Sequence, residues 1–199
     1  MIPDTNRFFE ILKPHFTDAS RYCKALCAKQ TREEAEDVFQ QSLLLALENF
    51  SSLKDTSKFR SWFFSIITRS FYTSVRRHFW KRFLSLETIN SGFPVIFSKE
   101  TFNEDSETLM KALGRLSEKE RSAVLLFEIA NFSIEEISVI QNERSQSAVK
   151  SRLSRARRKL RDYITRMDKN GISENKSSKI LTGDIENETL KIITEIDRE

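Results

Sequence analysis

Apolar side chains recur at helical spacing along most of the chain, and this pattern predicts an all-α protein. Residues 6–28 have the pattern of an amphipathic helical opening, and a long helix is expected from Thr31 to about Phe50. Residues 51–57 have the composition of a loop, and a further helical segment follows from Lys58 to Arg82. The core face expected for the long helix consists of Val38, Phe39, Ser42, Leu45, Ala46 and Phe50.

Three pairs of Ser or Thr with a Glu three residues later mark helix starts. In such a capping box, each of the two side chains binds a backbone N–H that the first turn leaves free. Asn131 lies before the last of these starts and suits a helix end, because Asn tolerates the left-handed conformation. The pairs are Thr31 with Glu34, Ser117 with Glu120, and Ser133 with Glu136.

A strongly basic helix is expected to begin near Ser145. Between Arg144 and Arg161 there are eight Lys or Arg residues and no acidic residue. One narrow apolar stripe contains Val149, Leu153, Ala156 and Leu160. The opposite face collects Ser147, Lys150, Ser151, Ser154, Arg155 and Arg158. Two short capped helices followed by such a helix predict a helix-turn-helix that inserts into the major groove of DNA. A solvated basic surface is the alternative interpretation.

The long helix from Thr31 carries a polar face opposite its core face. A single leucine, Leu44, interrupts this face. Leu44 is either an ordinary exposed apolar residue or the centre of a protein-docking surface. The residues of this face are Asp37, Gln40, Gln41, Leu44 and Glu48.

The segment from Lys58 to Arg82 combines positive charge with aromatic rings. It holds seven Lys or Arg residues, eight aromatic residues and no acid. Basic side chains interleaved with aromatic rings suit single-stranded DNA, because the positive charges contact the phosphate backbone and the rings stack on unpaired nucleobases. Phe63, Ile66, Ile67 and Phe71 are instead expected in the core.

Composition narrows the function classes. The chain of 199 residues has only 4 Gly and 3 Pro, which favours helices, and its net charge of +4 suits a polyanionic partner. Cys23 and Cys27 are expected to be core residues, with a redox role as the alternative. No catalytic motif or cofactor site is recognisable, so neither an enzyme nor a cofactor is predicted. No apolar run approaches the ~20 residues of a membrane span, and no signal peptide is visible, so a cytoplasmic protein without membrane insertion is expected.

Two ordered groups of motifs resemble a known family. Residues 35–40 (Ala-Glu-Asp-Val-Phe-Gln), residues 59–63 (Phe-Arg-Ser-Trp-Phe) and Arg76-Arg77 resemble region 2 of bacterial RNA polymerase sigma factors. Residues 116–121 (Leu-Ser-Glu-Lys-Glu-Arg), 133–137 (Ser-Ile-Glu-Glu-Ile) and 149–157 (Val-Lys-Ser-Arg-Leu-Ser-Arg-Ala-Arg) resemble region 4. The layout of two regions with a short linker is similar to the extracytoplasmic-function group.

The resemblance implies an alternative sigma factor with two small helical domains. Region 2 is expected in residues 1–82, a linker in 83–107, the region 4 helix-turn-helix in 108–165 and a C-terminal tail in 166–199. The implied partners are core RNA polymerase (the β′ clamp helices and the β flap), promoter DNA and possible anti-sigma factors.

The resemblance also implies three sets of binding residues. Polymerase would bind Asp37, Gln40, Gln41, Leu44 and Glu48. The −10 promoter element would be recognised and opened by Phe59, Arg60, Trp62, Arg69, Arg76 and Arg77. The −35 element would be read as duplex by Ser147, Lys150, Ser151, Arg152, Ser154, Arg155 and Arg158.

The chain departs from the family pattern at Ser70, at Ser74 and in the turn at residues 141–144, which is one residue longer than usual. Asn142 does stand where the turn requires Gly or Asn. Two other functions remain open on the sequence alone. One is a stand-alone helix-turn-helix regulator, which would need a dimer to read paired half-sites. The other is a degenerate sigma-like partner protein that binds polymerase or a regulator without binding promoters.

Overall fold

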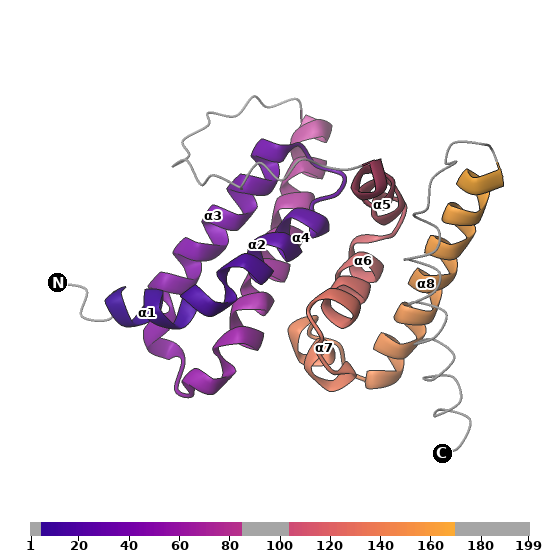
Figure 1. The fold of residues 1–199 in the computed structure, drawn as a ribbon. Helices are drawn as coiled ribbons and strands as arrows, with labels where there is room; N and C mark the ends of the chain where they lie inside the picture. Colours follow the sequence, from indigo (N-terminus) through magenta and orange to yellow (C-terminus); the bar gives the residue numbers. More distant parts are fainter. Residues whose placement is uncertain (1–4, 85–103, 170–199) are drawn as a thin grey trace, which may run out of the picture.

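The computed structural model describes residues 5–84 and 104–169, and these residues contain helices and turns without strands. The expected all-α class is therefore confirmed for the described part of the chain. Residues 5–84 are called the N-terminal unit here, and residues 104–169 the C-terminal unit. Figure 1 shows the two units side by side, with α1 to α4 in one and α5 to α8 in the other. The tail beyond residue 169 and most of the predicted linker lie outside the described residues.

The N-terminal unit packs three helical segments against one long helix. Pro14 lies in a 3-10 turn that separates the first two helices, because proline has no N–H to continue the hydrogen-bond ladder. Helix α3 packs on α4, which also contacts α2. The elements are α1 (Thr5–Leu12), η1 (Lys13–His15), α2 (Phe16–Leu26), α3 (Arg32–Glu48), η2 (Phe50–Ser52), η3 (Thr56–Lys58) and α4 (Phe59–Leu84).

The C-terminal unit has the predicted helix-turn-helix. A π-helical turn, η4, continues α6, and α8 packs on both α6 and α7. Asn131 and Asn142 adopt the left-handed conformation, with φ of 49° and 52°, where they end the helical segments before α7 and α8. The elements are α5 (Glu104–Gly114), α6 (Glu118–Val124), η4 (Leu125–Ile129), α7 (Ile134–Ile140) and α8 (Gln146–Lys169).

All three predicted capping boxes form, and each fixes a helix start. Thr31 opens α3, Ser117 opens α6 and Ser133 opens α7, in each case with reciprocal bonds to the Glu three residues later. Replacing such a capping residue by Ala typically costs about 1 kcal/mol. Local sequence therefore sets the orientation at which these helices leave their preceding turns.

The core is rich in aromatic rings and continues from one unit into the other. Phe63, Ile67 and Phe71 of α4 are fully buried, as expected, whereas Ile66 is only partly buried. Cys23 and Cys27 are buried free thiols, which agrees with their predicted place in the core. Buried side chains of both units belong to one hydrophobic cluster. The region between the units is therefore packed like a protein interior.

Candidate polymerase and nucleic-acid interfaces

Helix α8 presents an exposed polar and basic face. Ser145 precedes the helix, and its Oγ accepts a hydrogen bond from the Ala148 N–H at 3.3 Å. Val149, Leu153 and Ala156 are buried against the C-terminal unit. The exposed side chains include Ser147, Lys150, Ser151, Ser154, Arg155 and Arg158. This arrangement leaves one side of a helix-turn-helix available for a phosphate backbone and the edges of bases.

Arg152 lies apart from this face, contrary to the expected placement. Its side chain is buried, since it stands next to Leu153 at the edge of the apolar stripe. The guanidinium donates to Gln141 Oε1 and pairs with Glu143 Oε1 at 2.7 Å. In this conformation Arg152 holds α8 against the preceding turn, so its predicted contact with DNA requires a different side-chain position.

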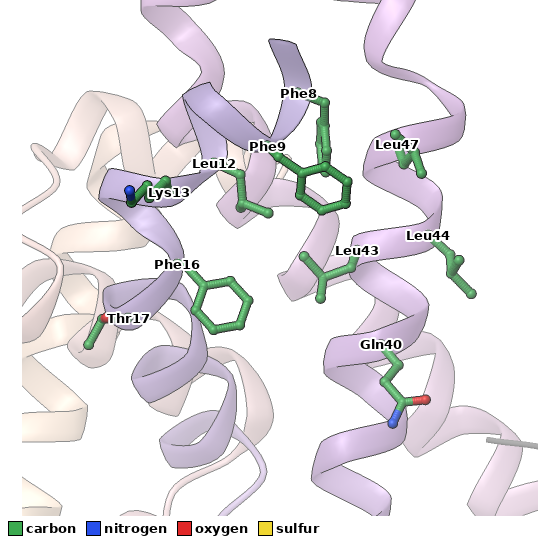
Figure 2. Close-up of a pocket in the computed structure, with 10 residues that line it drawn as sticks. All are labelled: Phe8, Phe9, Leu12, Lys13, Phe16, Thr17, Gln40, Leu43, Leu44 and Leu47. Atoms are coloured by element: carbon green, nitrogen blue, oxygen red, sulfur yellow. The ribbon is translucent and has the colours of Figure 1, made fainter. Parts of the chain in front are cut away.

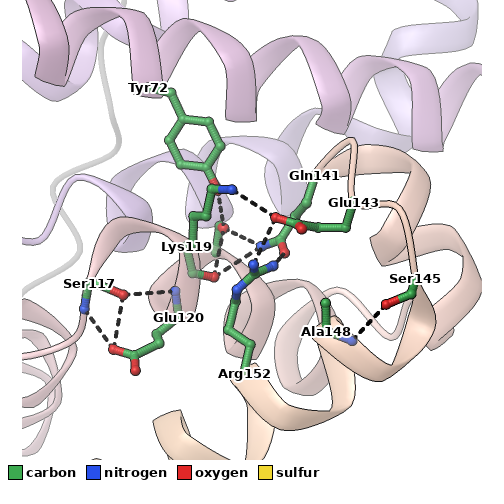
Figure 3. Close-up of polar contacts among 10 residues, drawn as sticks. Tyr72, Ser117, Lys119, Glu120, Gln141, Glu143, Ser145, Ala148 and Arg152 are labelled. Atoms are coloured by element: carbon green, nitrogen blue, oxygen red, sulfur yellow. Dashed lines mark hydrogen bonds and ion pairs between the residues drawn. The ribbon is translucent and has the colours of Figure 1, made fainter.

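Glu143 has a structural role that the sequence pattern did not reveal. Its carboxylate accepts hydrogen bonds from Lys119 at 2.8 Å and from Arg152 at 2.7 Å (Figure 3). The bond from Lys119, with that from Arg152, lowers the pKa of Glu143 against the opposing effect of burial. The longer turn at residues 141–144 thus supplies the anion that joins α6 to α8. The clue in the sequence was an acid between Asn142 and the basic helix.

The start of α4 is less exposed than predicted. Phe59 is only 1% exposed, and its ring contacts Phe8, Phe50 and Phe63. The predicted stacking of Phe59 on an unpaired base therefore does not fit this conformation, because the ring fills the core. Trp62 is half-buried and packs against the same core.

The predicted basic residues of α4 divide into two groups. Arg60 donates to the Ala130 carbonyl of the C-terminal unit, and its guanidinium carbon lies 4.2 Å from the ring centroid of Phe132. Arg69, Arg76 and Arg77 are exposed. Three of the four cations are therefore open to a nucleic acid, while Arg60 faces the other unit.

The polar face of α3 is exposed, as its pattern predicted, and it borders an apolar groove. Asp37, Gln41 and Glu48 are exposed, Gln40 is half-buried, and Leu44 is 50% exposed. The groove has a volume of about 580 Å³ and lies between α3 and the segment from α1 to the start of α2 (Figure 2). It is lined by Phe8, Phe9, Leu12, Lys13, Phe16, Thr17, Gln40, Leu43, Leu44 and Leu47.

This groove was not predicted, because it pairs apolar residues of two separate segments. Phe9 and Phe16 are 54% and 38% exposed, which is unusual for rings of this size. Their positions on Figure 2 place them opposite Leu43 and Leu44. An exposed apolar surface with a polar rim is typical of a protein-binding site.

Other classes of site receive no support in the described residues. Across residues 5–84 and 104–169, no group of His, Cys, Asp or Glu is arranged to hold a metal ion. Within the same part of the chain, no helix is long and apolar enough to cross a membrane.

Comparison with known proteins agrees with the two-part organisation. The family description "Sigma-70 region 2" matches residues 12–81, and "Sigma-70, region 4" matches residues 106–160. The sigma factor SigV of Bacillus subtilis is 27% identical over 147 residues, which cover 74% of this chain and 86% of SigV. The sigma factor YlaC of the same species is 30% identical over 141 residues, which cover 67% of this chain and 79% of YlaC.

Solved structures share the fold. The sigma factor RpoE in complex with the anti-sigma factor NepR from Bartonella quintana superposes with a TM-score of 0.67 and 24% identity, over 81% of this chain and 98% of RpoE. CnrH in complex with the cytosolic domain of CnrY has a TM-score of 0.58 and 19% identity, over 82% of this chain and 90% of CnrH. With the matches in sequence, the fold and the order of the two regions, the chain belongs to the RNA polymerase sigma factors of the extracytoplasmic-function group.

Proposed function

We propose that this sigma factor docks on core RNA polymerase through α3 and the adjoining groove, and that it reads promoters with α8 and α4. The exposed face of α8, which has no acidic residue from Gln146 to Arg161, is the observation that carries the promoter assignment. Lys and Arg on this face suit phosphates and base edges, and Ser147, Ser151 and Ser154 allow close approach to the duplex. The chain acts by binding, without a catalytic step of its own.

Recognition of the −10 element is assigned to the exposed arginines of α4. Arg69, Arg76 and Arg77 supply positive charge along one helix. Extruding a base from the duplex costs a few kcal/mol, so charge alone does not suffice and aromatic contacts must contribute. Trp62 is the predicted aromatic residue that remains partly accessible in this conformation.

The polymerase surface is assigned to Asp37, Gln40, Gln41, Leu44 and Glu48. The adjoining groove supports this assignment, because Phe9, Phe16 and Leu44 offer apolar area inside a polar rim. The β′ clamp helices are the proposed partner of this surface and the β flap that of the C-terminal unit. An anti-sigma factor is a further proposed partner, since the solved RpoE is bound to NepR.

Run-off transcription tests the proposed function. Purified core RNA polymerase is incubated with fragmented genomic DNA, with and without the full chain. Discrete new start sites are expected, and they define the −35 and −10 sequences. Binding to DNA without binding to polymerase would instead favour a stand-alone regulator. Polymerase binding without transcripts would favour a degenerate partner protein.

Asp37→Arg tests the docking surface. Asp37 is exposed, so its replacement is expected to weaken polymerase binding at least tenfold while the melting temperature changes little. Leu44→Glu is expected to act in the same way, because it places a charge at the groove. Lys54→Glu, a charge reversal in the exposed loop after η2, is the control. Normal polymerase binding by both Asp37→Arg and Leu44→Glu would mean that the docking surface lies elsewhere.

A further inference from the structure

The cations of α8 differ in whether a carboxylate neutralises them. Four of them pair with glutamates of the C-terminal unit: Arg152 with Glu143, Arg157 with Glu128, and both Arg155 and Lys159 with Glu120. Three others are exposed and have no ion-pair partner among residues 5–84 and 104–169. These three are Lys150, Arg158 and Arg161.

The three unpaired cations lie on one side of α8. At 100° per residue they fall within an arc of about 80°, and they are called the basic stripe. Lys150 and Arg161, at its two ends, are 11 residues apart, which is about 16 Å along a helix. Ser154 lies between them and is also exposed, so no large side chain interrupts the stripe. A partner that neutralises it needs negative charges spread over the same length.

The residues that follow α8 contain such a pattern. Residues 170–199 lie outside the described residues, and their sequence is strongly acidic in its last part. Residues 184–199 hold six acidic and two basic residues and are called the acidic segment. Asp184, Glu188 and Glu195 recur at i, i+4 and i+11, a spacing that predicts one side of a helix and covers 11 residues like the basic stripe. The neighbouring side of the same predicted helix collects Ile185, Ile192 and Ile196.

The connection between α8 and the acidic segment is long enough to bring the two together. Residues 170–183 comprise 14 residues, and a chain of this length spans at most about 46 Å. A flexible chain of the same length has a typical end-to-end distance of about 20 Å. From Lys169 back to Lys150 the distance along the helix is about 28 Å. The whole basic stripe is therefore within reach of the acidic segment of the same chain.

We propose that the acidic segment docks on the basic stripe of α8 and competes there with duplex DNA. Its carboxylates take the place of DNA phosphates, because both are anions that pair with exposed Lys and Arg. The tether gives the segment an effective concentration on the order of 1 mM, so weak ion pairs suffice for docking. The competition rests on the proposed DNA-binding role of α8, whereas the docking contact is measurable without DNA.

Paramagnetic broadening in NMR spectra tests the docking contact. A nitroxide is attached to Ser151→Cys, an exposed position beside the basic stripe, and the native cysteines are at most 2% exposed. Amide signals of residues 184–199 are expected to broaden at about 0.1 M salt, where the Debye length is about 10 Å, and to recover at about 1 M, where it is about 3 Å. A nitroxide on Lys54→Cys in the N-terminal unit is the control and is expected to leave these signals sharp. Unbroadened signals with the Ser151→Cys label at about 0.1 M salt would overturn the proposal.

A mixed sample distinguishes docking within one chain from docking between two copies. Unenriched protein with the Ser151→Cys label is added to isotope-enriched protein without a label. The signals of the acidic segment in the enriched protein are expected to stay sharp. Broadening of these signals would mean that the segment binds a second copy, and it would overturn docking within one chain.

Charge-neutralising variants of the full chain test the competition with DNA. Asp184→Asn/Glu188→Gln/Glu195→Gln is expected to bind a mixed-sequence duplex of about 20 base pairs about fivefold more tightly than wild type at about 0.1 M salt. The reason is that docking lowers the fraction of protein that can bind DNA. The control with the same change in net charge is Glu10→Gln/Glu33→Gln/Glu48→Gln, which alters three exposed carboxylates of the N-terminal unit. An equal gain in affinity by both variants would mean that overall charge causes the gain, and it would overturn the competition.

The failure of this inference differs from the failure of the proposed function. Absence of duplex binding by both wild type and variant, with broadening from the Ser151→Cys label, would contradict the DNA-binding role of α8 and support the docking contact. Duplex binding with equal affinity by wild type and variant would overturn the competition and support the DNA-binding role.

Discussion

Glu143 shows how one residue shapes the approach to the recognition helix. The turn before α8 is one residue longer than the family pattern, and its acid binds Lys119 of α6 and Arg152 of α8. Glu143 is 15% exposed, so its ionised form depends on these two cations. Glu120 has a comparable environment: burial acts to raise its pKa, but hydrogen bonds from Lys159 and Ser117 lower it overall. Acids in this unit serve to position basic side chains.

Glu143→Gln is expected to destabilise the protein by about 1–2 kcal/mol at neutral pH, because it removes charge-assisted bonds to Lys119 and Arg152. The pKa of Glu143 is lowered in the folded protein, so its contribution is fully present above the ordinary carboxyl pKa. That contribution disappears as pH falls through the lowered folded pKa. Urea unfolding from pH 7 down to pH 3 measures the difference between wild type and variant.

The matched control for this prediction is Glu135→Gln, which changes an exposed glutamate on α7. Its effect on the free energy of unfolding is expected to stay within about 0.5 kcal/mol at every pH. A difference for Glu143→Gln that does not shrink at low pH would contradict an electrostatic role.

At the scale of elements, helix α8 separates its structural and binding functions by face. Val149, Leu153 and Ala156 fix the helix to its unit, and the exposed side remains for a ligand. The exposed side has no acidic residue between Arg144 and Arg161, so no carboxylate in this stretch repels phosphate. Because the packing face is continuous, changes on the opposite face are expected to alter binding without unfolding the helix.

Lys150→Ala and Arg155→Ala are each expected to weaken binding to −35 duplex DNA. Each removes one potential phosphate or base contact, worth about 1–3 kcal/mol if it reads a base edge. A lost phosphate contact also reduces the slope of log affinity against log salt by about 1. Fluorescence anisotropy at several salt concentrations measures both quantities.

Arg166→Ala serves as the control for these variants, because Arg166 is exposed near the other end of α8. It is expected to change affinity much less than either variant at the start of the helix. Unchanged binding by both Lys150→Ala and Arg155→Ala, at low and moderate salt, would contradict the recognition-helix assignment.

At the scale of the whole molecule, contacts between the two units join them into one body. Arg121 donates to the Leu26 carbonyl, Phe132 packs on Phe64, and Arg60 donates to the Ala130 carbonyl; these contacts are called the seam. Buried residues of both units share a cluster, and Arg121 is buried where the units meet. A buried guanidinium that loses its carbonyl acceptors is strongly destabilising. The Arg121 contact therefore favours one relative position of the two units. The two units are therefore joined by specific contacts and not only by loose apolar packing.

Thermal unfolding is expected to show this coupling. Trp62 packs against the core of the N-terminal unit, so its fluorescence reports on that unit, while far-UV circular dichroism reports on both units. The two midpoints are expected to coincide in the wild type and to separate in Phe132→Ala, which weakens the seam by about 3 kcal/mol. The measurement is a pair of melting curves on the same sample.

Phe127→Ala is the control for the unfolding experiment, because Phe127 is half-buried within the C-terminal unit and lies near Arg157. It is expected to lower both midpoints together. Separate midpoints in the wild type would mean that the units unfold independently and that the seam contributes little to stability.

The sequence alone determined the helices, their starts and the family. Capping boxes and the left-handed Asn131 and Asn142 depend on neighbours within a few residues, so their pattern is visible in the chain itself. The exposed faces of α3 and α8 followed from helical spacing for the same reason. The order of the region 2 and region 4 motifs indicated the sigma factor family and, through it, the function.

Only the tertiary structure decided which predicted binding residues are free. Phe59 lies in the core. Arg60 contacts Ala130, which is 70 residues further along the chain. Arg152 is held by the turn before its own helix. The groove and the seam arise in the same way, since they bring together segments that are far apart in the chain. Arg121 and Leu26 are separated by 95 positions. Local periodicity reports which side of a helix is apolar, but it contains no information on which other helix covers that side.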